Sequence, residues 1–363
     1  MQIVYDILRI FQTEFPDYVE RMTQSNHHFD KDNLCPWHLC GGVWTHTMMV
    51  YNAYIQKLKT DFAPDERIKK MIAVILLCHD IGKIYTRAVP KGQFGKISFY
   101  GHGYASVQPC IEFINKLKNY RIDFSNDELY EILCVISNHI EYYDADDKKR
   151  SKIYHNNYRL YALFEFMLEF DTTGSIKDAE GYRKSDFLRI PENSLHNDNP
   201  TITIYCGVPA SGKDFIAEEF ETGEVISLDN IRVEEYLKNA PTEDIPVDII
   251  EVYNNAYKYC NEFKVNVDQL FIKKAKEILI NGKNVVMCIA SLKKSRTRYI
   301  SQFNKKYPVV IKYVVAGLET MYERDRTRNS KNLGKMIINK FAYNQQIPML
   351  TEGADYVMAI DND

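Results

Sequence analysis

Residues 201–206, a run rich in β-branched side chains, lead directly into the glycine-rich loop Gly207-Val208-Pro209-Ala210-Ser211-Gly212-Lys213. A strand, a loop with this glycine spacing and a following helix place backbone N–H groups around phosphate oxygens, and the helix N-terminus adds its dipole. The loop therefore predicts an α/β fold that binds a nucleotide, with Lys213 as a positive charge for its β- and γ-phosphates. The alternative is a purely structural glycine turn. The predicted nucleotide-binding residues are Gly207, Ala210, Ser211, Gly212, Lys213 and Asp214.

One position departs from the usual pattern of such loops. A Ser or Thr after the lysine normally holds Mg²⁺ through its hydroxyl, whereas this chain has Asp214 followed by Phe215. The later run at 285–289 also lacks a terminal acid of the usual kind. We infer that the Asp214 carboxylate holds Mg²⁺, directly or through water.

The rest of the second half supports the α/β prediction. Short apolar runs occur at residues 225–228, 285–289, 309–315 and 356–360, and helical stretches separate them, most clearly at 267–279. With the run before the glycine loop this makes five strands that alternate with helices, which is typical of a parallel sheet.

Acidic and basic side chains follow these runs. Asp229 comes after the second run, where it can accept the proton of an attacking hydroxyl, and Arg232 lies one helical turn on, where it can hold a phosphate of the acceptor. Residues 322–329 are dense in arginine where a lid would close, and lid arginines neutralise charge in phosphoryl transfer. The alternative for such a run is a solvated helix face. The predicted lid residues are Arg324, Arg326 and Arg328.

The first half reads as helical. Apolar residues recur at helical spacing within 128–139 and 160–170, and residues 71–78 form a continuous apolar run; a hairpin is the one strand-like feature expected, near residues 91–95. Residues 188–200 are polar and rich in turn-forming residues. The predicted organisation is a helical domain at 1–187, a linker at 188–200 and the α/β domain at 201–363.

The helical half carries a set of metal-ligand residue types. Histidine and aspartate bind Zn, Mn, Fe, Co or Ni, and two such ions can activate a water molecule and offset the charge of a phosphoester. For a single histidine the alternative is a core or surface residue, and for the last aspartate it is a helix cap. His38 lies close to the set, and Cys35 and Cys40 could help to bind metal, although no second Cys/His pair has zinc-site spacing. The predicted ligands are His46, His79, Asp80, His102, His139 and Asp171.

Composition sets outer limits on function. A net charge of −3 leaves no overall nucleic-acid footprint, so any basic surface must be local. The eight cysteines include no CxxC pair, which favours free thiols in a reducing compartment. No basic leader and no apolar run near the ~18 residues of a membrane span are visible, so we expect a cytoplasmic protein without a membrane partner.

The helical half resembles the HD phosphohydrolase superfamily over roughly residues 35–175. The resemblance implies an all-α HD-domain bundle with a transition metal (Mn, Co, Ni or Zn). It implies that His46, His79, Asp80 and Asp171 hold the core metal, that His102 and His139 supply a second site, and that Lys83 faces the scissile phosphate. The motifs that carry it, in family order, are Gly41-Gly42-Val43-Trp44-Thr45-His46, His79-Asp80-Ile81-Gly82-Lys83, Gly101-His102, Asn138-His139 and Asp171.

The second half resembles 5′-OH polynucleotide kinases, which implies a P-loop kinase fold with a helical lid and ATP with Mg²⁺. By this resemblance Lys213 grips ATP, Asp229 is the general base and Arg232 engages the 3′ side of the acceptor. One of the lid arginines then stabilises the transferring phosphoryl group. Asp214 and Ser291, where Asn is common, depart from the family pattern. The motifs are the glycine loop, Asp229-x-x-Arg232, Ser291-Leu292-x-x-x-Arg296, the arginine-rich lid, and Pro348-x-x-x-Glu352-Gly353-x-Asp355.

The order of the halves resembles the bacterial fusion of an HD phosphohydrolase with polynucleotide kinase, a family of RNA end-healing enzymes. It implies removal of 2′,3′-cyclic, 2′- or 3′-phosphates and phosphorylation of 5′-OH ends, with RNA or DNA ends and ATP as substrates and a separate RNA ligase as partner. Two other classes stay open. One is an HD nucleotidase fused to a nucleoside or metabolite kinase, and the other is a signalling module that senses a nucleotide and has an inactive loop.

Overall fold

The computed structural model describes residues 1–36, 38–60, 62–175, 199–241, 245–303, 305–328 and 332–363. The chain forms two compact units: unit 1 comprises Met1–Glu192 and Ala342–Ile347, and unit 2 comprises Asn193–Phe341 and Pro348–Asp363. The predicted linker at 188–200 lies outside the described residues except for its last two. Within the described residues, no helix is long and apolar enough to cross a bilayer.

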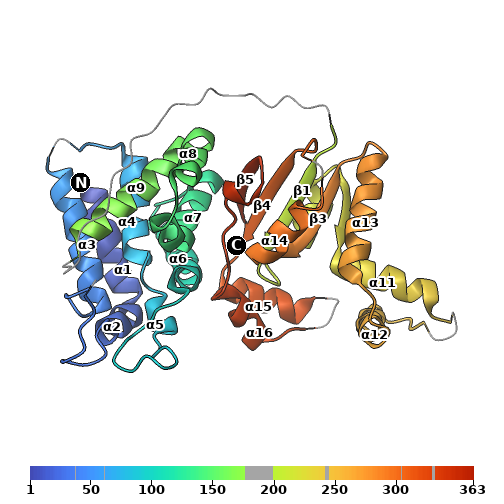
Figure 1. The fold of residues 1–363 in the computed structure, drawn as a ribbon, viewed down its shortest axis with the longest axis horizontal. Coiled ribbons are helices and arrows are strands. Elements are labelled where there is room, and N and C mark those ends of the chain that lie inside the picture. The colour runs from blue at the N-terminus through green and yellow to red at the C-terminus, as the bar shows by residue number, and fades with distance from the viewer. Residues whose placement is uncertain (37, 61, 176–198, 242–244, 304, 329–331) are drawn as a thin grey trace. The chain divides into compact units, whose positions relative to one another are not determined.

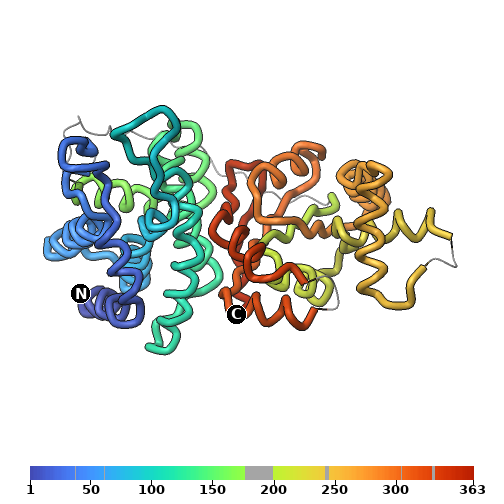
Figure 2. Tube along the Cα trace, turned by 90° about the horizontal axis from the view of Figure 1, so that it is seen from below, coloured from blue at the N-terminus to red at the C-terminus, as the bar shows by residue number. Residues whose placement is uncertain are grey.

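Unit 1 is helical in its described part. The apolar runs predicted as helices lie inside α4, α7 and α9, and α4 packs against α1, α3, α6, α7 and α9. Figure 1 labels α4 among α1, α3 and α9, and Figure 2 shows the same group of helices from below. The elements are α1 (Gln2–Glu14), α2 (Pro16–Gln24), α3 (Val43–Leu58), α4 (Glu66–Cys78), α5 (Lys83–Thr86), α6 (His102–Lys118), α7 (Asn126–Tyr143), α8 (Asp147–Asn156) and α9 (Tyr158–Thr173).

Local sequence fixes where the central helices begin. The Asp65 side chain caps α4 by accepting a hydrogen bond from the Ile68 amide, and Ser125 and Glu128 form a reciprocal capping box at the start of α7. Residues 71–78 of α4 are all buried, which explains why this run is apolar on every side rather than amphipathic. Because the end of α4 is buried, the next two residues, His79 and Asp80, also lie in the interior of unit 1.

The hairpin expected near residues 91–95 does not form a ladder of paired strands. Residues 88 and 98 make an isolated antiparallel bridge, and the segment between them consists of turns. Gly92 and Gly95 both have positive φ angles, at 75° and 83°, which bend the backbone repeatedly instead of extending it. The prediction of antiparallel pairing was right only for the residues that close the loop.

Unit 2 contains one parallel sheet of five strands in the order β2-β3-β1-β4-β5, which confirms the five predicted strands. The strands are β1 (Ile202–Gly207), β2 (Glu224–Ser227), β3 (Val285–Ala290), β4 (Val309–Val315) and β5 (Tyr356–Asp361). The helical elements are α10 (Lys213–Phe220), α11 (Leu228–Asn239), α12 (Ile249–Glu262), α13 (Val267–Ile280), α14 (Lys293–Ile300), α15 (Leu318–Thr327), α16 (Lys335–Ala342) and η2 (Leu350–Glu352).

The sheet determines where a ligand can bind. Ile202 of β1 pairs with Val285 of β3 on one side and with Val309 of β4 on the other, and every residue of β1 is buried. Because all strands are parallel, their carboxyl ends meet at one edge, and the crevice at this edge is the usual ligand site of open α/β sheets. The glycine loop follows β1 at this edge.

A buried ion pair joins the last motif of the sequence to α14. The Arg296 guanidinium donates two hydrogen bonds to the Glu352 carboxylate, Nε to Oε2 at 2.7 Å and Nη2 to Oε1 at 2.8 Å. A third, from Nη1, reaches the Ser291 carbonyl at 2.5 Å. Arg296 is fully buried and Glu352 is 8% exposed. This part of the motif therefore holds η2 against the end of β3.

Candidate metal and phosphate sites

A cavity of about 790 Å³ in unit 1 contains most of the predicted metal ligands in its wall. The ligands come from five segments of the unit: His46 lies in the first turn of α3, His79 and Asp80 follow α4, and His102, His139 and Asp171 lie on α6, α7 and α9. The predicted residues among its lining are Asp80, Lys83, His102, His139 and Asp171, and His38 lines it as well.

A close approach of two backbones explains the glycine in the His79-Asp80-Ile81-Gly82-Lys83 motif. A Cβ atom on Gly82 would lie 2.0 Å from the His102 carbonyl oxygen, so only glycine lets the turn after α4 touch α6. The Ser106 hydroxyl joins the two segments: it accepts a hydrogen bond from the Gly82 amide and donates one to the His79 carbonyl, each at 2.8 Å. The motif thus positions His79 and His102 relative to each other.

The six predicted ligands fall into two adjacent groups. His46, His79 and Asp171 form one, and Asp80, His102 and His139 form the other; within each group the ligand atoms all lie within 4.8 Å of one another. Asp80 also reaches toward the first group, with its Oδ2 atom 3.4 Å from Nε2 of His79. The arrangement can hold two cations with a carboxylate between them.

In three of these histidines, a hydrogen bond from one ring nitrogen determines which nitrogen faces the metal centre. The Nδ1 atoms of His79, His102 and His139 lie 2.9, 2.8 and 2.8 Å from the carbonyl oxygens three residues earlier in the chain. Each Nδ1 therefore carries the proton and each Nε2 offers its lone pair to the centre, as in most histidine metal sites.

Two observations show that this donor set fits cations. The Nε2 atoms of His102 and His139 lie 3.1 Å apart. Because each ring carries its proton on Nδ1, the lone pairs of the two Nε2 atoms face each other. This contact is repulsive unless a cation lies between the two atoms. Among the described residues, His79 Nε2 and Asp171 Oδ1 are buried without a hydrogen-bond partner. Such atoms cost roughly 1–3 kcal/mol each unless something binds them.

The electrostatics favour the metal-binding protonation states of His102, His139 and Asp80. Burial lowers the pKa of His102 to about 3, and burial together with His79 lowers the pKa of His139 to about 4. Burial would raise the pKa of the Asp80 carboxyl, but His79 and Lys83 outweigh it and hold that pKa well below its usual range. At neutral pH His102 and His139 are therefore neutral imidazoles and Asp80 is an ionised carboxylate. Burial would lower the pKa of His79, but Asp80 outweighs it and raises that pKa.

Three residues of this centre follow no motif in the sequence. Nζ of Lys83 lies 2.7 Å from Asp80 Oδ2 and 3.0 Å from Nε2 of His27, which is 2% exposed. The Tyr143 hydroxyl donates a hydrogen bond to Asp171. His27 and Tyr143 reach the centre through tertiary contacts with residues far away in the sequence, so their local sequence does not indicate that they belong to it. The same holds for Ser106.

A cavity of about 680 Å³ in unit 2 lies at the carboxyl edge of the sheet. Its wall combines the glycine loop after β1, residues from the start of α11 and residues of α15. Arg326 is not among the described residues that line it, and its Nε atom donates to the Tyr322 carbonyl at 3.4 Å. The predicted residues it brings together are Gly207, Ala210, Gly212, Lys213, Asp214, Asp229, Arg232, Arg324 and Arg328.

The loop has the backbone shape of an anion-binding turn. Ala210 and Gly212 have φ angles of 67° and 86°, and alternation of this kind turns successive N–H groups toward one side. The Ser211 carbonyl is held from outside the loop by Arg324 Nη1 at 3.1 Å and by Nδ2 of Asn362 at 2.7 Å. A Cβ atom on Gly212 would lie 2.4 Å from that amide nitrogen. Asn362, after β5, is a contributor that the sequence did not reveal.

Two ion pairs occupy the cavity wall. Nζ of Lys213 lies 2.6 Å from Asp214 Oδ2, and although burial would lower the pKa of Lys213, Asp214 outweighs it and raises that pKa. Nη1 of Arg232 lies 2.6 Å from Asp229 Oδ1 at the start of α11. Asp229 is well exposed to the cavity, whereas Lys213 is largely covered. Each pair places a carboxylate beside a cationic side chain at the wall of this cavity.

Comparison with known proteins gives distant structural similarities. No family model matches the chain, and no curated protein matches it. A chain in the structure of the Pnkp1/Rnl/Hen1 RNA repair complex is 17% identical, with a TM-score of 0.30 over 42% of this chain and 45% of that chain, so this chain spans less than half of its length. A sugar kinase from a Janibacter species is 12% identical, with a TM-score of 0.28 over 45% of this chain and 85% of that one. A Thermus thermophilus protein is 17% identical, with a TM-score of 0.27 over 45% and 89%.

Proposed function

We propose that the chain is a bifunctional RNA end-healing enzyme. Unit 1 is an HD-type phosphohydrolase domain that removes phosphate from 2′,3′ ends, and unit 2 is a P-loop kinase domain that phosphorylates 5′-OH ends with ATP. The observation that carries the proposal is that most residues of the two sets picked from the sequence line two separate cavities, one in each unit. A metal centre and a nucleotide loop in one chain fit two opposite phosphate reactions.

In unit 1 the chain's own residues bind and orient the phosphoester. When bound, two divalent cations would supply Lewis acidity and activate water. The two groups of ligands described above would hold them. Lys83 lies between Asp80 and His27 at the cavity wall, where its ammonium can neutralise a phosphate oxygen. Tyr143 holds the Asp171 carboxylate in one orientation through its hydrogen bond.

In unit 2 the residues position two substrates. Lys213 turns from Asp214 to the β- and γ-phosphates of ATP, since an ammonium that is already paired with a carboxylate can exchange it for phosphate. Asp229, with Oδ1 held by Arg232, accepts the proton of the 5′-hydroxyl. Arg328, the residue after α15, lines the cavity with its Nη1 atom 3.6 Å from Asp325 Oδ1, and we assign it to the transferring phosphoryl group. Arg324 holds the loop through the Ser211 carbonyl.

One incubation tests the whole proposal. An RNA oligomer with a 5′-OH and a 3′-phosphate is incubated with the full chain, ATP, and either Mg²⁺ or Mn²⁺, and the ends are read by mass spectrometry. We expect a 5′-phosphate in the Mg²⁺ reaction and loss of the 3′-phosphate with Mn²⁺. Free nucleosides that compete with the oligomer for phosphorylation would point instead to a small-molecule kinase. Absence of ATP turnover would favour the signalling module that senses a nucleotide and has an inactive loop.

Asp229→Asn is expected to slow the kinase reaction by roughly 10²–10⁴-fold, the usual contribution of a general base. Asparagine keeps the shape and can still contact Arg232, so ATP binding should be preserved. Single-turnover phosphorylation of the oligomer and a separate ATP-binding titration check this. Turnover close to that of the parent would remove Asp229 from the mechanism.

Asp214→Ala distinguishes three roles of this acid. If the carboxylate holds magnesium, the variant needs more Mg²⁺ for half-maximal kinase activity, and Asp214→Ser restores the parent's midpoint through its hydroxyl. If it only positions Lys213, the KM for ATP changes at saturating Mg²⁺ while the midpoint does not. If its charge only favours the first turn of α10, both variants lose about 0.3–1 kcal/mol of stability and nothing else. A magnesium titration of both variants beside the parent separates these outcomes, and we expect the shifted midpoint.

A further inference from the structure

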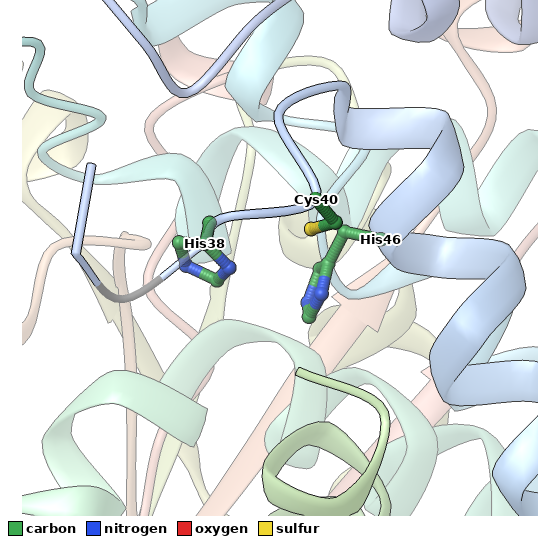
Figure 3. Close-up of side chains that lie close together, drawn as sticks. All are labelled: His38, Cys40 and His46. Carbon is green, nitrogen blue, oxygen red and sulfur yellow. The ribbon is translucent and has the colours of Figure 1, made fainter. Parts of the chain in front are cut away.

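The segment that precedes α3 brings a second kind of ligand close to the metal centre. His38, Cys40 and His46 each offer a ligand atom, and these atoms all lie within 4.8 Å of one another. Figure 3 shows the Cys40 thiol and the two imidazole rings turned toward one shared space. The ring centroids of His38 and His46 are 4.6 Å apart. The function proposed above uses His46 and leaves the other two side chains without a role.

His46 differs from the other histidines of the centre in its second nitrogen. Its Nε2 atom faces the first ligand group, 2.9 Å from Asp171 Oδ1 and 3.6 Å from Asp80 Oδ2. Its Nδ1 atom has no hydrogen-bond partner among the described residues, although His46 is completely buried. In His79, His102 and His139 the Nδ1 atom is bonded to a backbone carbonyl. Because Nε2 of His46 faces the first ligand group, its Nδ1 atom is the nitrogen that can bind a second cation, together with Cys40.

The turn that carries the other two ligands is held in place. The His38 ring stacks on the ring of His27, with centroids 4.1 Å apart, and the His27 Nδ1 atom lies 2.7 Å from the Gly41 carbonyl. The Gly41 amide donates to the His38 carbonyl at 3.0 Å, and its φ angle of 79° closes the turn. The Nδ1 atom of His38 is also buried without a partner among the described residues. The turn thus presents a preformed pair of donors.

We propose that Cys40, His38 and Nδ1 of His46 form a further metal site, for a borderline or soft cation such as Zn²⁺. A thiolate selects such cations over Mg²⁺, and three protein ligands leave a fourth position open, as in zinc sites that also bind a small ligand. The site rests on the proposed function only in sharing His46 with the first ligand group. That imidazole then bridges the two cations.

Binding at this site involves proton release and no redox change. The Cys40 thiol loses its proton to solvent, and the sulfur donates an electron pair to the cation. His46 loses its remaining ring proton to solvent, so that each of its nitrogens donates an electron pair to one cation. His38 binds as a neutral imidazole. Loading the site should therefore be weaker at low pH, as for any site whose ligands must deprotonate.

Cobalt is the probe because a Co²⁺–thiolate bond gives an intense charge-transfer absorption that histidine and carboxylate ligands do not give. The full chain is stripped with a chelator, titrated with Co²⁺, and its bound cobalt is counted by elemental analysis. We expect the charge-transfer band in the parent and in Cys35→Ser, a matched thiol change in the same segment. We expect Cys40→Ser and His38→Gln to lose the band and about one bound cobalt per chain.

Further variants separate this proposal from the proposed function. His139→Gln, in the second ligand group, should keep the band while phosphoester hydrolysis falls. A parent without phosphoester hydrolysis but with the band supports the new site and counts only against the proposed function. A band that persists in Cys40→Ser, or a cobalt content equal to that of the parent, overturns the proposal. Kinase activity of unit 2 and the thermal unfolding midpoint of each variant confirm that the chain is folded.

Discussion

Asp80→Asn is expected to lose phosphoester hydrolysis to background while it keeps the 5′ phosphorylation rate of the parent. Asp80 lies between the two ligand groups, with Oδ2 3.4 Å from His79 Nε2 and Oδ1 3.3 Å from His102 Nε2. Asparagine removes the negative charge that would be shared by two cations, and it preserves the volume of the buried side chain. Its amide oxygen can still accept a hydrogen bond from Lys83. Initial rates of both reactions on the doubly modified RNA oligomer measure the effect.

Asp229→Asn is the reciprocal control, since it should slow only the kinase reaction. Metal content adds a readout that does not depend on activity, because Asp80→Asn should bind fewer divalent ions after chelation and reloading. Both tryptophans of the sequence fall within residues 1–192, and Trp44 lies on α3 with its ring stacked on Phe11, so tryptophan fluorescence reports whether unit 1 is folded in the variant. A folded Asp80→Asn variant that loses both reactions would contradict two independent sites.

Glu352→Leu is expected to destabilise unit 2 by about 3–5 kcal/mol, the usual cost of removing one partner of a buried ion pair. The substitution leaves the Arg296 guanidinium buried with two of its hydrogen bonds lost. Replacing both residues, as Arg296→Met with Glu352→Leu, removes the uncompensated charge and should recover most of that loss. Denaturant unfolding followed by far-UV circular dichroism measures all three proteins.

Tryptophan fluorescence supplies an internal reference, because it reports unit 1 and should not shift in these variants. Glu277→Gln is the matched surface control: Glu277 lies 3.8 Å from Lys273, and both side chains are more than half exposed. Exposed pairs of this kind contribute about 0–1 kcal/mol, so this variant should unfold almost as the parent does. An equal loss for Glu352→Leu and Glu277→Gln would show that the buried pair has no special role.

Local signals predicted a large part of both units. The strand runs, the glycine loop and the Asp229–Arg232 spacing depend on neighbouring residues, and the structure places them as expected at one edge of the sheet. The candidate metal ligands could be picked from the sequence because His79 and Asp80 adjoin a fully apolar helix, and because the other candidates follow in the order that the resemblance to a known family implies.

The remaining contributors could not be read from the sequence because their roles depend on tertiary contacts. His27 contacts Lys83 from an irregular segment, and Asn362, which follows the edge strand β5, reaches the Ser211 carbonyl although the two residues are far apart in the sequence. The sequence does not distinguish the three lid arginines. In the structure, Arg324 contacts the glycine loop, whereas Arg326 donates a hydrogen bond to the Tyr322 carbonyl of its own helix. The hairpin prediction failed at residues 91–95 because Gly92 and Gly95 have positive φ angles, which bend the backbone where a paired strand would be extended.

The strand order of unit 2 has a consequence for the time course of folding. Ile202 of β1 pairs with Val285 and Val309, so β1 has no strand to pair with until most of unit 2 has been synthesised, and the loop it carries also needs Asn362. Non-local pairing of this kind slows folding relative to helices joined by short connections. We expect refolding to restore tryptophan fluorescence of unit 1 first and ATP binding later. Simultaneous recovery in a stopped-flow experiment would contradict this order. On the ribosome, the nucleotide loop would then be among the last parts of the protein to acquire its working shape.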